Sequence, residues 1–207
     1  MALLDVSFPW GVCDAGYDVI TIKFGHHNEI IIVPKRRRMR VKYPLQFNPA
    51  LYRIFANLDG TPEACAEFAS QYGLLSRCGD NPEGEPFKIW QRNIADMRKQ
   101  IAAWEVDPTS LAFNDKSEIK VGECDAVLQL LPPDGRIALR VRPRTLLAGM
   151  EIQLAAAVAR GLEVRRCDQC SQLFEVGPGG RRSQSRFCSK QCQINFNNEK
   201  QRKRTKQ

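Results

Sequence analysis

Four cysteines near the C-terminus constrain this chain more than any other feature of its sequence. Two residues separate Cys167 from Cys170, three separate Cys188 from Cys192, and seventeen residues connect the two pairs. Two close cysteine pairs joined by a short connection have the spacing of a closed Cys₄ zinc site, in which four thiolates surround the ion tetrahedrally. We therefore predict that Cys167, Cys170, Cys188 and Cys192 bind one structural Zn²⁺ ion.

Disulfide bonds are the other common use of paired cysteines, and they require an oxidising compartment. The N-terminal segment MALLDVSFPWG has neither a basic start nor a long apolar core, so we expect no secretory signal peptide. No stretch approaches the roughly 18 apolar residues of a membrane span. We therefore expect a soluble, cytoplasmic protein without a membrane partner. The other four cysteines are scattered and predict no second metal site; they are Cys13, Cys65, Cys78 and Cys124.

The residues between and after the cysteine pairs predict a small folded module. Residues 173–176 are typical of a strand, 177–180 of a turn, and 186–187 of a returning strand. Ser189 is a good helix N-cap, which would place Cys188 before a helix and Cys192 in its first turn. The order is that of a treble-clef zinc finger. We expect a small core around the metal made by Leu173, Phe174, Phe187 and Ile194.

The segment CDQCSQLFEVGPGGRRSQSRFCSKQC resembles the C-terminal zinc fingers of the bacterial CGNR type, which combine a CxxC pair, LF, RR and a CSxxC pair. The resemblance covers about residues 165–204. The sequence departs from the pattern after Cys192, where Gln-Ile-Asn stands in place of Gly-Asn-Arg. The resemblance implies a zinc-bearing, DNA-binding bacterial transcription regulator. The matching residues are Cys167, Cys170, Leu173, Phe174, Arg181, Arg182, Cys188, Ser189 and Cys192.

Positive charge is concentrated on the same segment. Residues 165–207 contain eleven Lys and Arg against three acidic residues, so they carry the whole net charge of +8, and the preceding residues balance. This asymmetry is typical of a polyanion binder. A protein-interaction adaptor with an acidic partner, or an RNA-binding protein, remains an alternative to the DNA-binding regulator. The predicted nucleic-acid contacts are Arg181, Arg182, Arg186, Lys190, Lys200, Arg202, Lys203 and Arg204.

Two further polar features have open interpretations. Six cations occur between Lys35 and Lys42. They would either contact phosphate or protect an edge strand from pairing. His26 and His27 are adjacent, and we interpret residues 25–28 as a polar turn rather than a metal site.

Residues 1–163 predict a mixed α+β domain, and residues 164–207 the zinc module. Strands are expected at 17–24 and 29–33 and a hairpin at 126–131 and 136–141. Helices are expected at 48–57, 61–73, 87–104 and 145–161, with a polar loop at 76–85. The third helix carries an apolar seam that would allow a homodimeric coiled coil, but it is short, and packing within the chain is preferred. This domain would pair subunits or sense a small-molecule effector.

Enzymatic motifs are missing from the sequence. It contains no GxSxG, P-loop, HExxH or dinucleotide-binding pattern, and its two histidines are adjacent. We therefore predict that the protein is not an enzyme.

Overall fold

The computed structural model describes residues 9–24, 27–76, 83–106, 124–131, 136–177, 181–182 and 184–204. The chain divides into two compact units, the first comprising Met1–Lys99 and Glu118–Ala156 and the second Gln100–Ser117 and Ala157–Gln207. Helices are combined with antiparallel strands, which confirms the α+β class. The domain boundary expected between residues 163 and 164 stays a prediction. No described helix is long and apolar enough to cross a bilayer.

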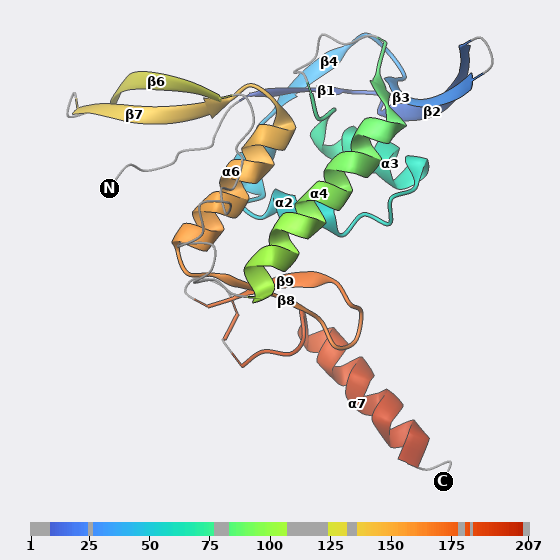
Figure 1. Cartoon of the computed structure of the whole chain (residues 1–207), viewed down its shortest axis with the longest axis vertical. Coiled ribbons are helices and arrows are strands. Elements are labelled where there is room, and N and C mark those ends of the chain that lie inside the picture. The colour runs from blue at the N-terminus through green and yellow to red at the C-terminus, as the bar shows by residue number, and fades with distance from the viewer. Residues whose placement is uncertain are drawn as a thin grey trace. The chain divides into compact units, whose positions relative to one another are not determined.

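The first unit contains three antiparallel strand groups (Figure 1). Strand β1 (Trp10–Cys13) pairs with β4 (Met39–Lys42), and β6 (Cys124–Leu131) pairs with β7 (Arg136–Pro143). Strand β2 (Tyr17–Phe24) pairs with β3 (His27–Pro34), whose other edge holds the two-residue β5 (Glu85–Pro86). The predicted strands and the hairpin are confirmed. Of the turn expected at residues 25–28, residues 27 and 28 instead pair within β3, and Gly25 and His26 lie outside the described residues.

Six helices are described, and local capping signals locate three of them. The start of α3 is confirmed, because the Thr61 side chain accepts a hydrogen bond from the Ala64 N–H at 3.3 Å, and Thr145 caps α6 in the same way. Helix α3 ends at Gly73, whose φ of +99° lies in the region that favours glycine. The helices are α1 (Pro44–Phe47), α2 (Leu51–Ala56), α3 (Pro62–Tyr72), α4 (Phe87–Val106), α6 (Leu146–Ala159) and α7 (Lys190–Arg204).

Two expectations for the first unit are wrong. Asn48 does not begin α2: its side chain donates to the Pro44 carbonyl at 3.1 Å and closes α1, and the N-cap of α2 is Ala50. The polar loop expected through residue 85 ends earlier. Glu85 is 1% exposed and accepts hydrogen bonds from the Leu75 and Ser76 N–H groups, which draws it into β5. The first error arises because a competing local hydrogen bond uses Asn48 to close the preceding helix, and the second because non-local donors hold Glu85.

Aromatic rings fill the core of the first unit. The ring centroids of Phe55 and Phe68 are 5.5 Å apart, and both lie about 6 Å from Trp90. Residues of the predicted apolar seam on α4 are buried in the chain itself, so the seam is not available for a coiled coil; they are Phe87, Trp90, Ile94, Met97 and Ile101. The side chain of Trp104 lies outside the described residues.

Helix α6 is buried on several sides. Ala148 and Ile152 are buried in addition to Met150 and Leu154, so apolar positions surround the helix. Gln153 is nevertheless 4% exposed, because its amide is fully used by the backbone near α1 and α2. Its Oε1 accepts from the Leu51 N–H at 3.0 Å, and its Nε2 donates to the Leu45 and Asn48 carbonyls.

The basic run between β3 and β4 is partly paired within the first unit. Lys35 lies 3.1 Å from Asp18, and the Lys42 ammonium donates to the Gln71 carbonyl at 2.6 Å. Strand β4 pairs only with β1 among the described strands.

The second unit contains β8 (Glu163–Arg166), β9 (Leu173–Val176) and α7. Strand β9 is confirmed, but its partner is β8, which the sequence presented only as a linker. The return strand expected at residues 186–187 is wrong. The CxxC turn reverses the chain so tightly that the residues directly before it become the nearest partner of β9.

Candidate metal centre

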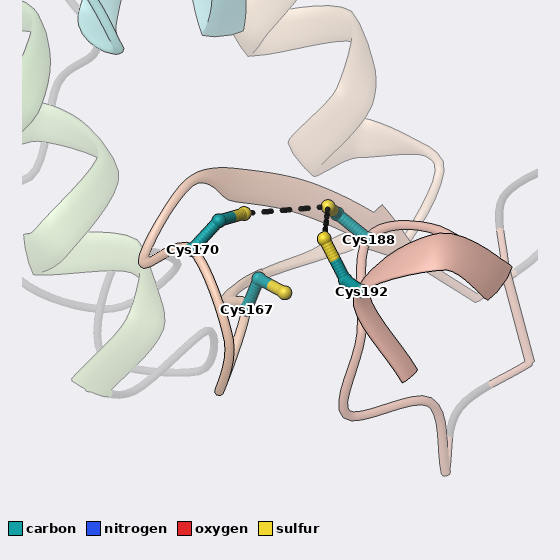
Figure 2. Close-up of side chains that lie close together, drawn as sticks. All are labelled: Cys167, Cys170, Cys188 and Cys192. Atoms are coloured by element: carbon teal, nitrogen blue, oxygen red, sulfur yellow. Dashed lines mark hydrogen bonds between the residues drawn. The ribbon is translucent and has the colours of Figure 1, made fainter. Parts of the chain in front are cut away.

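The first cysteine pair lies on a tight turn between β8 and β9. The Cys167 N–H donates to the Gln172 carbonyl at 2.9 Å, and the Ser171 N–H donates to the Cys167 carbonyl at 2.8 Å. Ser171 closes the turn with a φ of +59°, a left-handed conformation unusual for a residue other than glycine. The turn directs the thiols of Cys167 and Cys170 toward the same region (Figure 2).

The second pair lies at the start of α7. The Ser189 hydroxyl accepts a hydrogen bond from the Cys192 N–H at 3.1 Å, which confirms Ser189 as the cap. Cys188 therefore directly precedes the cap, and Cys192 lies in the first turn. The positive end of the helix dipole lies at this turn, and N–H groups there have no partner within the helix. Both features favour the thiolate form of a cysteine over the thiol.

The four sulfur atoms meet at one place (Figure 2). All lie within 4.8 Å of one another, and the Cys170–Cys188 and Cys188–Cys192 Sγ separations are both 3.5 Å. A tetrahedral ion with metal–sulfur bonds near 2.3 Å requires sulfur separations of about 3.8 Å. The thiols thus form a cluster suited to one metal ion. No second group of three or more potential ligands occurs within the described residues.

A small apolar core supports the cluster. Cys167, Phe174 and Val176 are buried together, and Phe187 packs against them. Ile194 does not join this core, because its side chain is 42% exposed. Phe196 takes its place, with its ring centroid 5.2 Å from that of Phe187. One helical turn separates Cys192 from Phe196, so both lie on the same face of α7.

The thiols differ in how readily they ionise. Burial opposes ionisation of Cys167, but N–H groups of Cys188, Cys170 and Gln169 point at its sulfur and lower its pKa from 9.0 to about 6. Burial raises the pKa of Cys188 to about 12, with additional contributions from the neighbouring thiols, and burial also raises the pKa of Cys170. Four thiolates cannot coexist there without a compensating cation, so metal binding must release protons.

Side chains connect the two halves of the cluster. The Asp168 carboxylate accepts hydrogen bonds from Arg186 Nε at 2.7 Å and Nη2 at 2.5 Å. The Asp168 N–H donates to the Arg186 carbonyl at 3.1 Å. Gln169 Nε2 donates to the Glu199 carboxylate on α7 at 2.8 Å. Both residues between Cys167 and Cys170 therefore connect the CxxC turn to the segment that supplies the other two thiols.

The predicted nucleic-acid contacts fall into three groups. Arg181, Arg182, Lys190, Lys200 and Arg202 are exposed. Arg186 is occupied by Asp168, and its guanidinium lies 6.0 Å from the centre of the Phe187 ring. Lys203 and Arg204 belong to the backbone of α7, but their side chains lie outside the described residues.

A surface hollow with a volume of about 320 Å³ lies beside the cluster. Nothing in the sequence indicated it. It brings together Arg181, Arg186 and Lys190, which the sequence places several residues apart. Only their positive charge was visible beforehand. The remaining residues that line it are Gln184, Ser185, Phe187, Ser189 and Gln193.

Comparisons with protein-family models, curated proteins and solved structures find no match to this chain. The four-cysteine cluster is consistent with a zinc finger, and no family match supports the CGNR type.

Proposed function

We propose that the chain is a DNA-binding transcription regulator whose C-terminal module folds around one zinc ion. The observation that supports this most is a coincidence: residues 165–207 carry both the four-thiol cluster and the whole net charge of +8. A basic surface held by a structural metal is a common arrangement for contacting the phosphate backbone.

Zinc is the ion that the ligand set favours. Four thiolates with tetrahedral spacing suit Zn²⁺, which has no redox chemistry of its own. All four positions would be filled by protein, which leaves no position for an activated water. The ion would stabilise a module whose core is only a few side chains. We therefore propose a structural rather than a catalytic metal.

Helix α7 offers a polar face for groove contacts. Lys190, Gln193, Asn197 and Lys200 are exposed and recur at intervals of three, four and three residues, so they lie on one side of the helix. The major groove of B-DNA admits a helix, where Lys contacts guanine and Asn or Gln contacts adenine. Exposed arginines on the preceding loop would contact phosphate and fix the orientation.

The test is binding of the zinc-loaded full chain to a short mixed-sequence DNA duplex. Fluorescence anisotropy across about 50–200 mM KCl gives the slope of log affinity against log salt, which becomes shallower by about 0.9 for every phosphate that the protein no longer neutralises. Lys200→Gln/Arg202→Gln should reduce the slope by up to about two units. Lys23→Gln/Lys99→Gln removes two exposed charges from the first unit and should leave it unchanged.

Wild-type protein that shows no salt-dependent binding would overturn the proposal. Stronger binding to RNA of the same sequence would replace DNA by RNA. A protein partner retained after nuclease treatment, with no nucleic-acid binding, would support the adaptor instead.

A further inference from the structure

Cationic and hydrogen-bonding side chains line most of the hollow beside the metal cluster. Three of its eight lining residues are cationic, two are serines, two are glutamines, and none is acidic. Its volume of about 320 Å³ lies at the lower end of the range for small-ligand sites. A site with this lining attracts an oxyanion that accepts several hydrogen bonds.

Two of the three cations are not committed elsewhere. The Arg186 guanidinium forms an ion pair with Asp168, with Nη2 lying 2.5 Å from the carboxylate Oδ2. Within the described part of the chain, no side-chain hydrogen bond or ion pair engages the Arg181 guanidinium or the Lys190 ammonium. The net charge that faces an incoming group is therefore supplied by Arg181 and Lys190.

The backbone holds these two residues in fixed positions. Arg181 forms a bridge to Val176 at the end of β9, with its N–H donating to Glu175 O at 3.2 Å and its carbonyl accepting from the Gly177 N–H at 2.8 Å. Lys190 is the first residue of α7, directly after the cap that orients Cys192. Both sides of the hollow thus depend on elements that the metal cluster joins.

We propose that this hollow is a clamp for a single backbone phosphate of bound DNA, held between Arg181 and Lys190. The inference rests on the proposed DNA binding and specifies where the complex is anchored. The exposed face of α7 begins at the clamp, since Lys190 and Gln193 belong to both. A phosphate held there would fix the position at which the helix enters the groove.

Charge compensation is a competing explanation for the same cations. Four thiolates around Zn²⁺ carry a net charge of about −2, and nearby cations would offset it. In that case, removing Arg181 or Lys190 would weaken zinc binding. A phosphate clamp predicts unchanged zinc affinity and a changed salt slope, so the two explanations are separable.

The experiment compares Arg181→Gln, Lys190→Gln and the double variant in the zinc-loaded full chain, with the same duplex and salt series. Two cations that share one phosphate should act non-additively. Each single variant should bind more weakly with nearly the wild-type slope, and the double variant should lose about one unit of slope. Arg181→Lys/Lys190→Arg retains the charges and should keep the wild-type slope. Zinc content and competition with a chelator are measured for every variant.

The outcomes separate this inference from the proposed function. If wild type binds DNA and the Arg181→Gln/Lys190→Gln variant keeps the wild-type salt slope, the clamp is refuted and the proposed function stands. The control variant Lys23→Gln/Lys99→Gln should keep that slope in every case. A loss of about one unit in each single variant and two in the double would show independent phosphates and also refute the clamp. Weaker zinc binding with an unchanged slope would establish charge compensation instead. Wild type that fails to bind DNA removes both proposals.

Discussion

The four clustered thiols are placed to hold one metal ion, and we expect each of them to be needed for metal binding. Cys170 is the exposed member, so its replacement by serine disturbs little of the surrounding packing. Cys170→Ser should nevertheless reduce zinc affinity by more than the 10–100-fold typical of substitutions outside the ligand shell. Zinc content after dialysis against a weak chelator measures this loss. Cys124→Ser, at a half-buried cysteine of the first unit, is the matched control and should retain full zinc content.

Arg186 illustrates how a residue expected to contact DNA can have a structural task. Its pair with Asp168 is partly exposed, so we expect it to contribute only about 0.2–1 kcal/mol to stability. Its larger effect should be on the cluster, because Asp168 lies between two ligands. Arg186→Gln and Asp168→Asn should each weaken zinc binding by about tenfold, the lower end of the range for outer-shell substitutions, because the pair is partly exposed.

A double-mutant cycle tests whether these two residues act together. If the pair is the cause, the double variant should lose no more zinc affinity than either single variant. Additive losses in a chelator competition assay would show that Arg186 and Asp168 act separately. Arg182→Gln, an exposed arginine on the same loop, should leave zinc affinity unchanged.

Among elements, helix α6 depends on a buried polar anchor. Gln153 satisfies one N–H and two carbonyls near the starts and ends of α1 and α2. Gln153→Leu keeps a similar volume but removes the donor to the Leu45 carbonyl, and it leaves the Leu51 N–H and the Asn48 carbonyl only their 3.1 Å hydrogen bond to each other. This should destabilise the first unit by about 1–3 kcal/mol. Urea unfolding followed by tryptophan fluorescence measures the change. Gln91→Leu, at an exposed position of α4, should change stability by less than about 0.5 kcal/mol.

The elements also show which parts of the fold were predictable. Thr61, Thr145 and Ser189 were recognisable as caps because each one bonds to an N–H three residues later. Strand β8 was missed because its partner lies beyond the CxxC turn, and a short segment such as Glu163–Arg166 has no periodicity long enough to read. Glu85 was assigned to a loop because nothing local shows that Leu75 and Ser76 donate to it.

The same reasoning applies to the candidate site. Cysteine spacing predicted a convergence that the structure contains. Ile194 was expected in this core and Phe196 was missed, because the phase of α7 relative to the metal could not be deduced from the sequence. The hollow requires residues 181 and 190 to meet, which depends on the irregular path between them.

For the whole molecule, metal removal should affect the two kinds of cysteine differently. Burial and nearby carboxylates raise the pKa of Cys65 to about 12, and its side chain is 0% exposed. At pH 8 only about one Cys65 thiol in ten thousand would be a thiolate, the form that reacts with alkylating reagents. Its reactivity should stay low at neutral pH and rise only as the pH approaches 12. Cys170, in contrast, is exposed and would be protected chiefly by a bound metal.

Alkylation with iodoacetamide, followed by peptide mapping, tests this difference in the full chain. Zinc-loaded protein should show slow modification at Cys170 and Cys192, and a zinc chelator should accelerate it strongly at both. Cys65 should remain unmodified in both cases, because its protection comes from burial within the first unit rather than from zinc. Rapid modification of the cluster before chelation would argue against a bound metal. If Cys65 became reactive together with the cluster, loss of zinc would be unfolding both units, and the metal would stabilise the whole chain rather than its C-terminal module.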